Sequence, residues 1–259
     1  MYNIILVALN ARYTHTSLAL RYIYANLNEF RSTALIREFT INDNIYDIAE
    51  ELLAHQPKII AFSVYIWNIS PISNLIDIIK KISQNIIIIL GGPEVSYEPI
   101  RVDISKADFI VCGEGEIEFY NLIKKIFNNV GIDTKVIQKT VPNISDIKYP
   151  YQYYSNEDIK NRYIYVEASR GCPFLCEFCL SSVDKKVRYF EIDSLLNEFE
   201  ILWDRGARNF KFIDRSFNLN IEFAIKILGF FLSKKESYFL HFEVIPDLFP
   251  DSLLELLGK

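Results

Sequence analysis

Three cysteines in the C-terminal half of the chain have the spacing of metal ligands. Cys172, Cys176 and Cys179 are separated by three and then two residues, so their thiolates share one short loop. Soft thiolates of this kind select zinc, copper(I) or iron–sulfur clusters. Four cysteines in 259 residues are too few for a disulfide scaffold. The spacing therefore indicates a metal site rather than disulfide bonds.

The number of nearby ligands favours an iron–sulfur cluster over zinc. A structural zinc site takes four protein ligands, but the fourth cysteine, Cys112, is distant in sequence and no histidine is near the loop. We expect Cys112 to be an inert core thiol. Three thiolates on a 4Fe-4S cluster leave one iron open to bind a small molecule, and Pro173 and Phe174 would stiffen and dry the loop. We expect such a cluster; the alternatives are zinc with an unidentified fourth ligand, a redox dithiol of Cys176 and Cys179, and three buried structural cysteines.

Two charged residues are candidates to act beside this loop. Arg170 precedes the first cysteine closely and could balance the charge of a cluster or of a carboxylate. A structural salt bridge is the alternative role for Arg170. Glu243 lies on a later predicted strand and would face the same edge if strand side chains alternate. For Glu243 the alternative is an ordinary charge partner.

The elements that precede the loop alternate short apolar runs with amphipathic segments. Strands are predicted at 3–9, 34–41, 58–65, 86–90 and 108–112, and helices at 17–30, 46–55, 70–84 and from the turn at 113–116 to about 127. Continuous apolar strands in such a series predict a parallel sheet with helices on both faces. We therefore place one doubly wound α/β domain at residues 1–127.

A second strand–helix series carries the cysteines. Residues 128–162 contain prolines, asparagines and tyrosines without a sustained period, and we expect a linker with one short strand near 135–139. Strands are then predicted at 163–168, 209–214 and 239–245, with helices at 194–204 and 221–232 and another beginning at 253. The domain at 163–259 thus has three βα units, and the cysteine loop follows its first strand.

Two glycine pairs end strands of the first domain. Gly91 and Gly92 remove side chains where the tail of a ligand could approach the backbone. A tight turn before Pro93 explains them equally well. Gly113–Glu116 lacks the third glycine of a dinucleotide fingerprint, and its two carboxylates would repel a pyrophosphate. We expect this segment to supply acidic residues to the start of a helix.

The chain resembles radical S-adenosylmethionine enzymes, whose signature is three cysteines with this spacing after the first strand of a partial barrel. It is most similar to the bacterial group in which a cobalamin-binding-like domain precedes that barrel. Besides the cysteines, the segments that carry the resemblance are Asn10–Tyr22, Phe62–Asn68, Gly91–Glu94, Gly113–Glu116 and Phe212–Asn218. The resemblance implies a Rossmann-like (flavodoxin-like, cobalamin-binding type) parallel sheet followed by part of a (β/α) barrel. Since a complete barrel of the family has about six βα units and three are present, it also implies a C-terminally incomplete portion of a longer protein.

The resemblance implies an activity and roles for individual residues. The open iron would bind the amino and carboxylate groups of S-adenosylmethionine (SAM). An electron from a flavodoxin- or ferredoxin-type donor would then release methionine and a 5′-deoxyadenosyl radical for an unknown substrate. Phe178 would lie beside the adenine. In many relatives a Gly-Gly-Glu-like segment binds the amino group; its glycines are absent here, and Asp214 would accept from that group instead.

Cobalamin is a further expectation of the same resemblance, for methyl transfer or rearrangement. Domains that supply a protein ligand to cobalt carry an Asp-x-His-x-x-Gly pattern after the first strand. Here that position reads Asn10-Ala11-Arg12-Tyr13-Thr14-His15, so the pattern is absent and we expect His15 to be an ordinary loop residue. Relatives bind cobalamin without such a histidine, which leaves binding open.

Composition excludes several other classes of function. The net charge of −5, with acidic and basic residues mixed, gives no basic stripe for a nucleic-acid backbone. The apolar runs are too short to cross a membrane, and the N-terminus lacks the pattern of a signal peptide. We therefore expect a cytoplasmic protein without nucleic-acid or membrane partners. The alternative to an enzyme is a non-catalytic iron–sulfur or corrinoid binding module.

Overall fold

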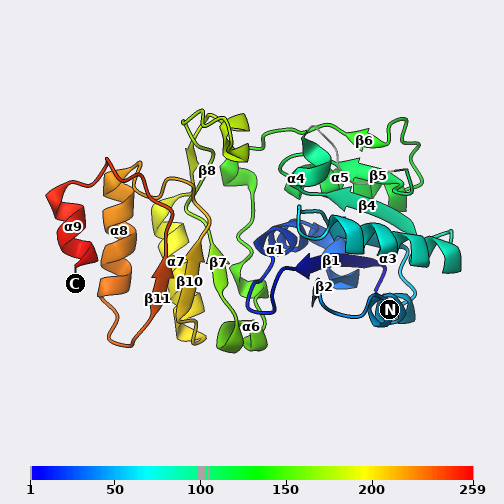
Figure 1. Cartoon of the computed structure of the whole chain (residues 1–259), viewed down its shortest axis with the longest axis horizontal. Coiled ribbons are helices and arrows are strands. Elements are labelled where there is room, and N and C mark those ends of the chain that lie inside the picture. The colour runs from blue at the N-terminus through cyan, green and yellow to red at the C-terminus, as the bar shows by residue number, and fades with distance from the viewer. Residues whose placement is uncertain (1, 98–102, 104, 259) are drawn as a thin grey trace. The chain divides into compact units, whose positions relative to one another are not determined.

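The computed structural model describes residues 2–97, 103 and 105–258 and divides the chain into two compact units. The first unit is Met1–Tyr153 and the second is Tyr154–Lys259 (Figure 1). The division falls inside the segment predicted as a linker, 128–162. The short strand expected near 135–139 is present as β6 (Val136–Ile137).

The first unit is built on a six-stranded parallel sheet in the order β2-β1-β3-β4-β5-β6. Its other strands are β1 (Ile4–Asn10), β2 (Ala34–Thr40), β3 (Ile59–Ser63), β4 (Ile87–Gly91) and β5 (Phe109–Val111). Its helices are α1 (Leu18–Ala25), η1 (Asn28–Thr33), α2 (Ile45–Ala54), α3 (Ile69–Ile82), α4 (Pro93–Ser96), α5 (Glu116–Phe127), η2 (Ile144–Asp146) and η3 (Tyr151–Tyr153). The predicted alternation and parallel sheet are confirmed.

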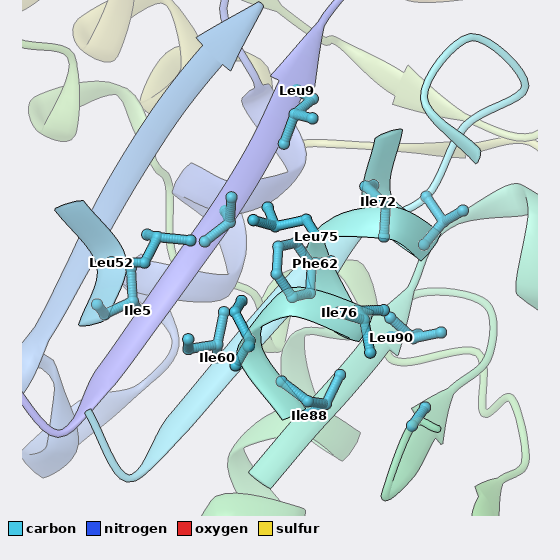
Figure 2. Packing of buried hydrophobic residues seen from close by; sticks show 14 of the residues in the cluster. Ile5, Leu9, Leu52, Ile60, Phe62, Ile72, Leu75, Ile76, Ile88 and Leu90 are labelled. Carbon is cyan, nitrogen blue, oxygen red and sulfur yellow. The ribbon is translucent and has the colours of Figure 1, made fainter. Parts of the chain in front are cut away.

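Strand alternation distributes the apolar side chains between two cores. Ile5, Val7 and Leu9 of β1 face the core under α2 and α3, whereas Ile4 and Leu6 face the core under α1 and α5. Figure 2 shows the first core, in which β1, β3 and β4 meet the apolar faces of α2 and α3. Because both sheet faces are covered, all seven residues of β1 are buried.

The second unit contains a three-stranded parallel sheet in the order β11-β10-β7 and a two-stranded antiparallel hairpin of β8 and β9. The strands are β7 (Ile164–Val166), β8 (Ser169–Arg170), β9 (Arg188–Tyr189), β10 (Asn209–Phe212) and β11 (Phe239–His241). The helices are α6 (Asn156–Asn161), η4 (Leu180–Val183), α7 (Ile192–Asp204), α8 (Ile221–Leu232) and α9 (Asp251–Leu257). Phe199, Phe210, Phe212 and Phe231 pack ring against ring in its core.

Several elements are shorter than predicted, and several short ones, among them α4, α6 and the β8–β9 hairpin, were not predicted. The strands expected at 163–168 and 209–214 end at Val166 and Phe212. Beyond these ends, the Ala168 N–H donates to the Asp214 side chain instead of to a neighbouring strand. The helix expected over 17–30 ends at Ala25, and η1 follows with Asn28 in the left-handed region (φ 50°). The β8–β9 hairpin was not predicted. Within the described residues, no helix has the length and apolar character needed to span a bilayer.

Candidate functional site

The order of the six-stranded sheet creates a switch point between β1 and β3. From β1 the chain moves outward to β2 on one side, and the later strands follow on the other side. In open parallel sheets, ligands bind beyond the carboxyl ends of the strands at such a point. Asn10 ends β1, Ser63 ends β3 and Gly91 ends β4, so these residues mark the edge that a ligand would approach.

The segment after β3 is tied across the switch point to the end of β1. The Asn68 side chain is 1% exposed; its Nδ2 donates to the carbonyls of Leu9 (3.1 Å) and Ser63 (3.0 Å), and its Oδ1 accepts from the Tyr65 N–H. Trp67 Nε1 also donates to the Leu9 carbonyl, at 3.2 Å. The Tyr65 and Trp67 rings stack with centroids 4.6 Å apart, and burial raises the pKa of the Tyr65 hydroxyl. Trp67 is nonetheless 44% exposed, so a fixed aromatic surface lies at this edge.

The segment after β1 is fixed by a buried carboxylate. Glu38 of β2 accepts from Asn10 Nδ2 (3.1 Å) and the Ser17 N–H, and it pairs with Arg21 at 2.7 Å. Asn10 Nδ2 also donates to the carbonyl of His15. Burying an ion pair is costly, and the hydrogen bonds from Asn10 and Ser17 to Glu38 offset part of that cost. The loop between Asn10 and Ser17 is therefore held at both ends.

Of the two glycines predicted to lie near a ligand or in a tight turn, Gly92 is required by the close approach of its backbone to that of Val64. It has φ 107°, and a Cβ there would lie 2.6 Å from the Val64 carbonyl oxygen. The Val64 N–H donates to the carbonyl of Gly91 at 2.7 Å, which brings the two loops together. A Cβ on Gly91 would make an ordinary 3.5 Å contact with the Val111 carbonyl oxygen. The turn interpretation accounts for Gly92, and a ligand contact at either glycine stays a prediction.

Ser63 was not singled out from the sequence, yet its side chain lacks a hydrogen bond to any described residue at this edge. It is 7% exposed, and its Oγ has no hydrogen-bond partner among the described residues. A buried hydroxyl without a partner costs about 1–3 kcal/mol. Because Ser63 ends β3 at the switch point, a polar ligand group at this edge would fit it. The sequence signal was its place near the end of the strand predicted at 58–65.

In the second unit, the first residues of the cysteine loop, Gly171 and Cys172, pack closely against the backbone of residues 184–186, and we call this part the base of the loop. Gly171 has φ 90°, and a Cβ there would lie 2.5 Å from the Lys186 carbonyl oxygen. The Cys172 N–H donates to the carbonyl of Asp184 at 2.8 Å, and Cys172 is buried. Cys176 is exposed and Cys179 is partly exposed. The first cysteine is thus anchored at the base, while the other two lie further out on the loop.

The structure does not gather these cysteines into one coordination sphere. No group of three or more His, Cys, Asp or Glu residues is arranged to hold a metal ion in the part of the chain that the structure describes. The donor chemistry still suits soft metals, because backbone and side-chain hydrogen bonds from Ser181 lower the pKa of Cys179, with Arg215 contributing, and so favour its thiolate. The prediction that Cys172, Cys176 and Cys179 are ligands stays a prediction.

Two predicted site residues are engaged by other side chains of the chain. Arg170 donates to Glu167 Oε1 from Nε (2.9 Å) and Nη2 (2.7 Å), so the structural salt bridge that was its alternative role is present. Glu243 pairs with Arg215 at 3.0 Å, and both side chains are exposed. Phe178 is 95% exposed. Roles for Arg170, Glu243 and Phe178 toward a cofactor stay predictions.

Asp214 is buried and fully engaged. It is 2% exposed, its two carboxylate oxygens accept from the Ala168 N–H at 3.1 and 3.0 Å, and Oδ1 also accepts from Ser169 Oγ at 2.6 Å. Burial raises the pKa of Asp214 to about 7, whereas these hydrogen bonds act to lower it. The described partners of Asp214 thus belong to the strand end that leads to the cysteines. Its predicted contact with SAM stays a prediction.

Comparison with known proteins gives a consistent result. Residues 4–123 match the B12 binding domain family. The chain is 26% identical over 237 residues to an uncharacterized methyltransferase of Pyrococcus horikoshii, which covers 83% of this chain and 52% of that protein. It is 24% identical over 191 residues to the cobalamin-dependent radical SAM methyltransferase TokK of Streptomyces tokunonensis, covering 63% of this chain and 28% of TokK.

Solved structures share the fold along the chain. The radical SAM methyltransferase TsrM of Kitasatospora setae, with cobalamin and a [4Fe-4S] cluster bound, matches with a TM-score of 0.75 at 17% identity, covering 100% of this chain and 57% of TsrM. The cobalamin-dependent SAM radical enzyme OxsB matches with a TM-score of 0.69, covering 98% of this chain and 41% of OxsB. The predicted fold class, a Rossmann-like sheet followed by part of a barrel, is confirmed. The chain spans about half the length of the Pyrococcus relative.

Proposed function

The chain carries a B12-binding domain and is related to cobalamin-dependent radical SAM methyltransferases, and from that premise we propose that it binds cobalamin, a 4Fe-4S cluster and SAM as part of a methyltransferase. Cobalamin would bind at the carboxyl edge of the six-stranded sheet, and the cluster on Cys172, Cys176 and Cys179. When bound, the cluster supplies the electron that cleaves SAM, and cobalamin supplies a carrier for the methyl group. The acceptor substrate and the flavodoxin- or ferredoxin-type electron donor belong to the same proposal.

The observation that carries the cobalamin proposal is the unsatisfied Ser63 hydroxyl at the switch point of the domain. Around it, Asn68 fixes the neighbouring loop and Trp67 presents an exposed ring. Apolar surface with a few placed polar groups is what a large cofactor requires. These residues would bind and orient the cofactor and exclude water from one side of it.

We propose that cobalamin binds without a histidine ligand to cobalt from the loop after β1. Asn10 stands where the ligand pattern would have aspartate, and its amide is engaged by Glu38 and the His15 carbonyl. Arg12 stands where the pattern would have histidine. The residues of this loop would therefore shape the site without supplying a ligand to cobalt.

Titration with hydroxocobalamin, followed by absorbance and equilibrium dialysis, tests this site. Ser63→Ala removes one hydrogen bond, worth about 1 kcal/mol, so the dissociation constant should rise about 5-fold. Ser32→Ala is the control, because Ser32 lies on η1 ahead of β2, at the amino edge of the sheet. Binding that is unaffected by Ser63→Ala would exclude the switch-point edge, and no binding by the unaltered chain would exclude cobalamin.

Anaerobic reconstitution with iron and sulfide tests the cluster. The reduced chain should give an electron paramagnetic resonance signal of a [4Fe-4S] centre that shifts when SAM is added, and Cys176→Ala should abolish it. Cys112→Ala is the matched control, since that thiol is buried in the first unit. A signal that does not change when SAM is added would instead support the non-catalytic cluster-binding module. Zinc without any cluster would contradict the proposal.

A further inference from the structure

Asp214 lies at the sheet edge from which the cysteine loop departs. β10 pairs in parallel with β7, with Phe212 opposite Val166, and the Ile213 N–H extends the pairing by donating to the Val166 carbonyl at 2.9 Å. The chain therefore leaves both strands at the same edge and side by side. Asp214 follows β10 by two residues, and Ala168 follows β7 by two residues.

The carboxylate of Asp214 connects these two departing segments. Ala168 N–H and Ser169 Oγ, 46 and 45 residues away in sequence, both donate to it. The 2.6 Å bond from Ser169 is short, as expected when the acceptor carries charge. Because Ser169 is buried as well, water does not compete freely for either group.

The segment that Asp214 holds leads into the base of the cysteine loop. Ser169 opens β8 and pairs with Tyr189 of β9, and the Phe190 N–H donates to the Ala168 carbonyl at 3.1 Å. Beyond β8, Gly171 packs against the backbone of Lys186. Displacement of Ser169 would therefore move β8, which ends two residues before Cys172.

Burying the Asp214 carboxylate close to Glu167 costs free energy. Glu167 lies close enough to oppose ionisation of Asp214, and Asp214 in turn raises the pKa of Tyr189, for which burial is the larger cause. Arg170 is paired with Glu167. An apolar side chain would avoid the cost of burying a carboxylate. A buried group with donors on both oxygens is instead suited to fixing one conformation of the segment that it binds.

We propose that Asp214 is a positioning residue for the cysteine loop, holding Ala168 and Ser169 so that Cys172, Cys176 and Cys179 project from a fixed base. The inference rests on the proposed function, because a fixed base matters for bringing three thiolates to one cluster. Substitution of residues that orient metal ligands without binding the metal commonly weakens metal affinity 10- to 100-fold. Asp214 would act in this way through the backbone rather than by touching the cluster.

The test compares cluster loss to an iron chelator in reconstituted protein. Ser169→Ala removes only the 2.6 Å hydrogen bond, and Asp214→Asn replaces an acceptor oxygen by a donor; both should speed iron release about 10-fold. Ser169→Thr keeps the hydroxyl and should restore the slow rate. Rates equal to that of the unaltered chain in both Ser169→Ala and Asp214→Asn would overturn the inference.

The matched control is Asp158→Asn. Asp158 is also a buried carboxylate of the second unit, but it caps α6, which precedes β7 and so lies at the strand's amino end. Its loss should lower the melting temperature without speeding iron release. Equal acceleration in Asp158→Asn would show general destabilisation and overturn the inference.

Hydrogen exchange of residues 168–172 separates this inference from the proposed function. If the unaltered chain takes up no cluster, the proposed function fails, but the anchoring can still be measured in the cluster-free chain. Faster exchange in Ser169→Ala would support the role of Asp214, and unchanged exchange would contradict it.

Discussion

At the scale of single residues, burial and hydrogen bonding act on Asp214 in opposite directions. Burial, the larger effect, raises its pKa from 3.8 to about 7, while the Ser169 hydroxyl and the Ala168 N–H favour the charged form. An acid whose pKa is higher in the folded state holds its proton longer there than in the unfolded chain. Its contribution to stability is therefore complete below pH 4 and is lost as the pH rises toward 7.

This contribution predicts a pH dependence specific to the second unit. The stability of the chain relative to Asp214→Asn should fall by a few kcal/mol between pH 4 and pH 8, because the pKa of Asp214 is about 7 in the folded chain and near its ordinary value in the unfolded one. Fluorescence of Trp203 in a Trp67→Phe background reports unfolding of this unit, since the chain has two tryptophans. A difference that stays constant or grows with pH would contradict the raised pKa.

At the scale of elements, two adjacent glycines differ in what the fold demands of them. Gly92 has a positive φ and no room for a Cβ beside Val64, whereas Gly91 has ordinary space. Gly92→Ala combines backbone strain with a steric clash between the loops after β3 and β4. Gly91→Ala is therefore a closely matched control.

We expect Gly92→Ala to lower the free energy of unfolding by about 2–4 kcal/mol, and Gly91→Ala by less than about 1 kcal/mol. Urea denaturation followed by Trp67 fluorescence in a Trp203→Phe background measures both. If Gly91→Ala impairs hydroxocobalamin binding while leaving stability intact, the predicted approach of a ligand to Gly91 gains support. Similar losses of stability in the two variants would contradict the close approach of the loops.

The sequence was sufficient to predict the main elements, because buried parallel strands are continuous apolar runs. Ile86–Leu90 is such a run, and β4 lies there. The β8–β9 hairpin could not be predicted, since two-residue strands joined by a long loop leave no periodic signal. The hydrogen bonds of Asp214 could not be predicted either, because its partners, Ala168 and Ser169, are brought to it only by the pairing of β7 with β10.

The candidate cofactor edge was predicted only in part. The glycines at the end of β4 were visible in the sequence, but Ser63 and Asn68 resemble an ordinary strand-end residue and an ordinary loop residue there. Their importance depends on the order of the strands, which places the end of β3 beside the end of β1. Sequence patterns predict that a segment forms a strand more readily than they predict which strands lie beside it in the sheet.

At the scale of the whole molecule, the two proposed cofactor sites lie in different compact units of the chain. The cobalamin proposal involves only residues of the first unit, and the cluster proposal only residues of the second. A ligand stabilises the structure that binds it, by about 2.7 kcal/mol at 100 times its dissociation constant. Each cofactor should therefore leave a distinct local signature.

Hydrogen exchange followed by mass spectrometry on the intact chain would separate these signatures. Hydroxocobalamin should slow exchange in 10–17 and 63–68, the loops that Glu38 and Asn68 fix at the switch point. Iron and sulfide should slow exchange in 171–184, where two of the three cysteines are not buried. Cys176→Ala should remove the second effect and keep the first. Ser63→Ala should weaken the first effect at hydroxocobalamin concentrations near the dissociation constant and leave the second unchanged. Protection by hydroxocobalamin that is confined to 171–184 would contradict the assignment of cobalamin to the first unit.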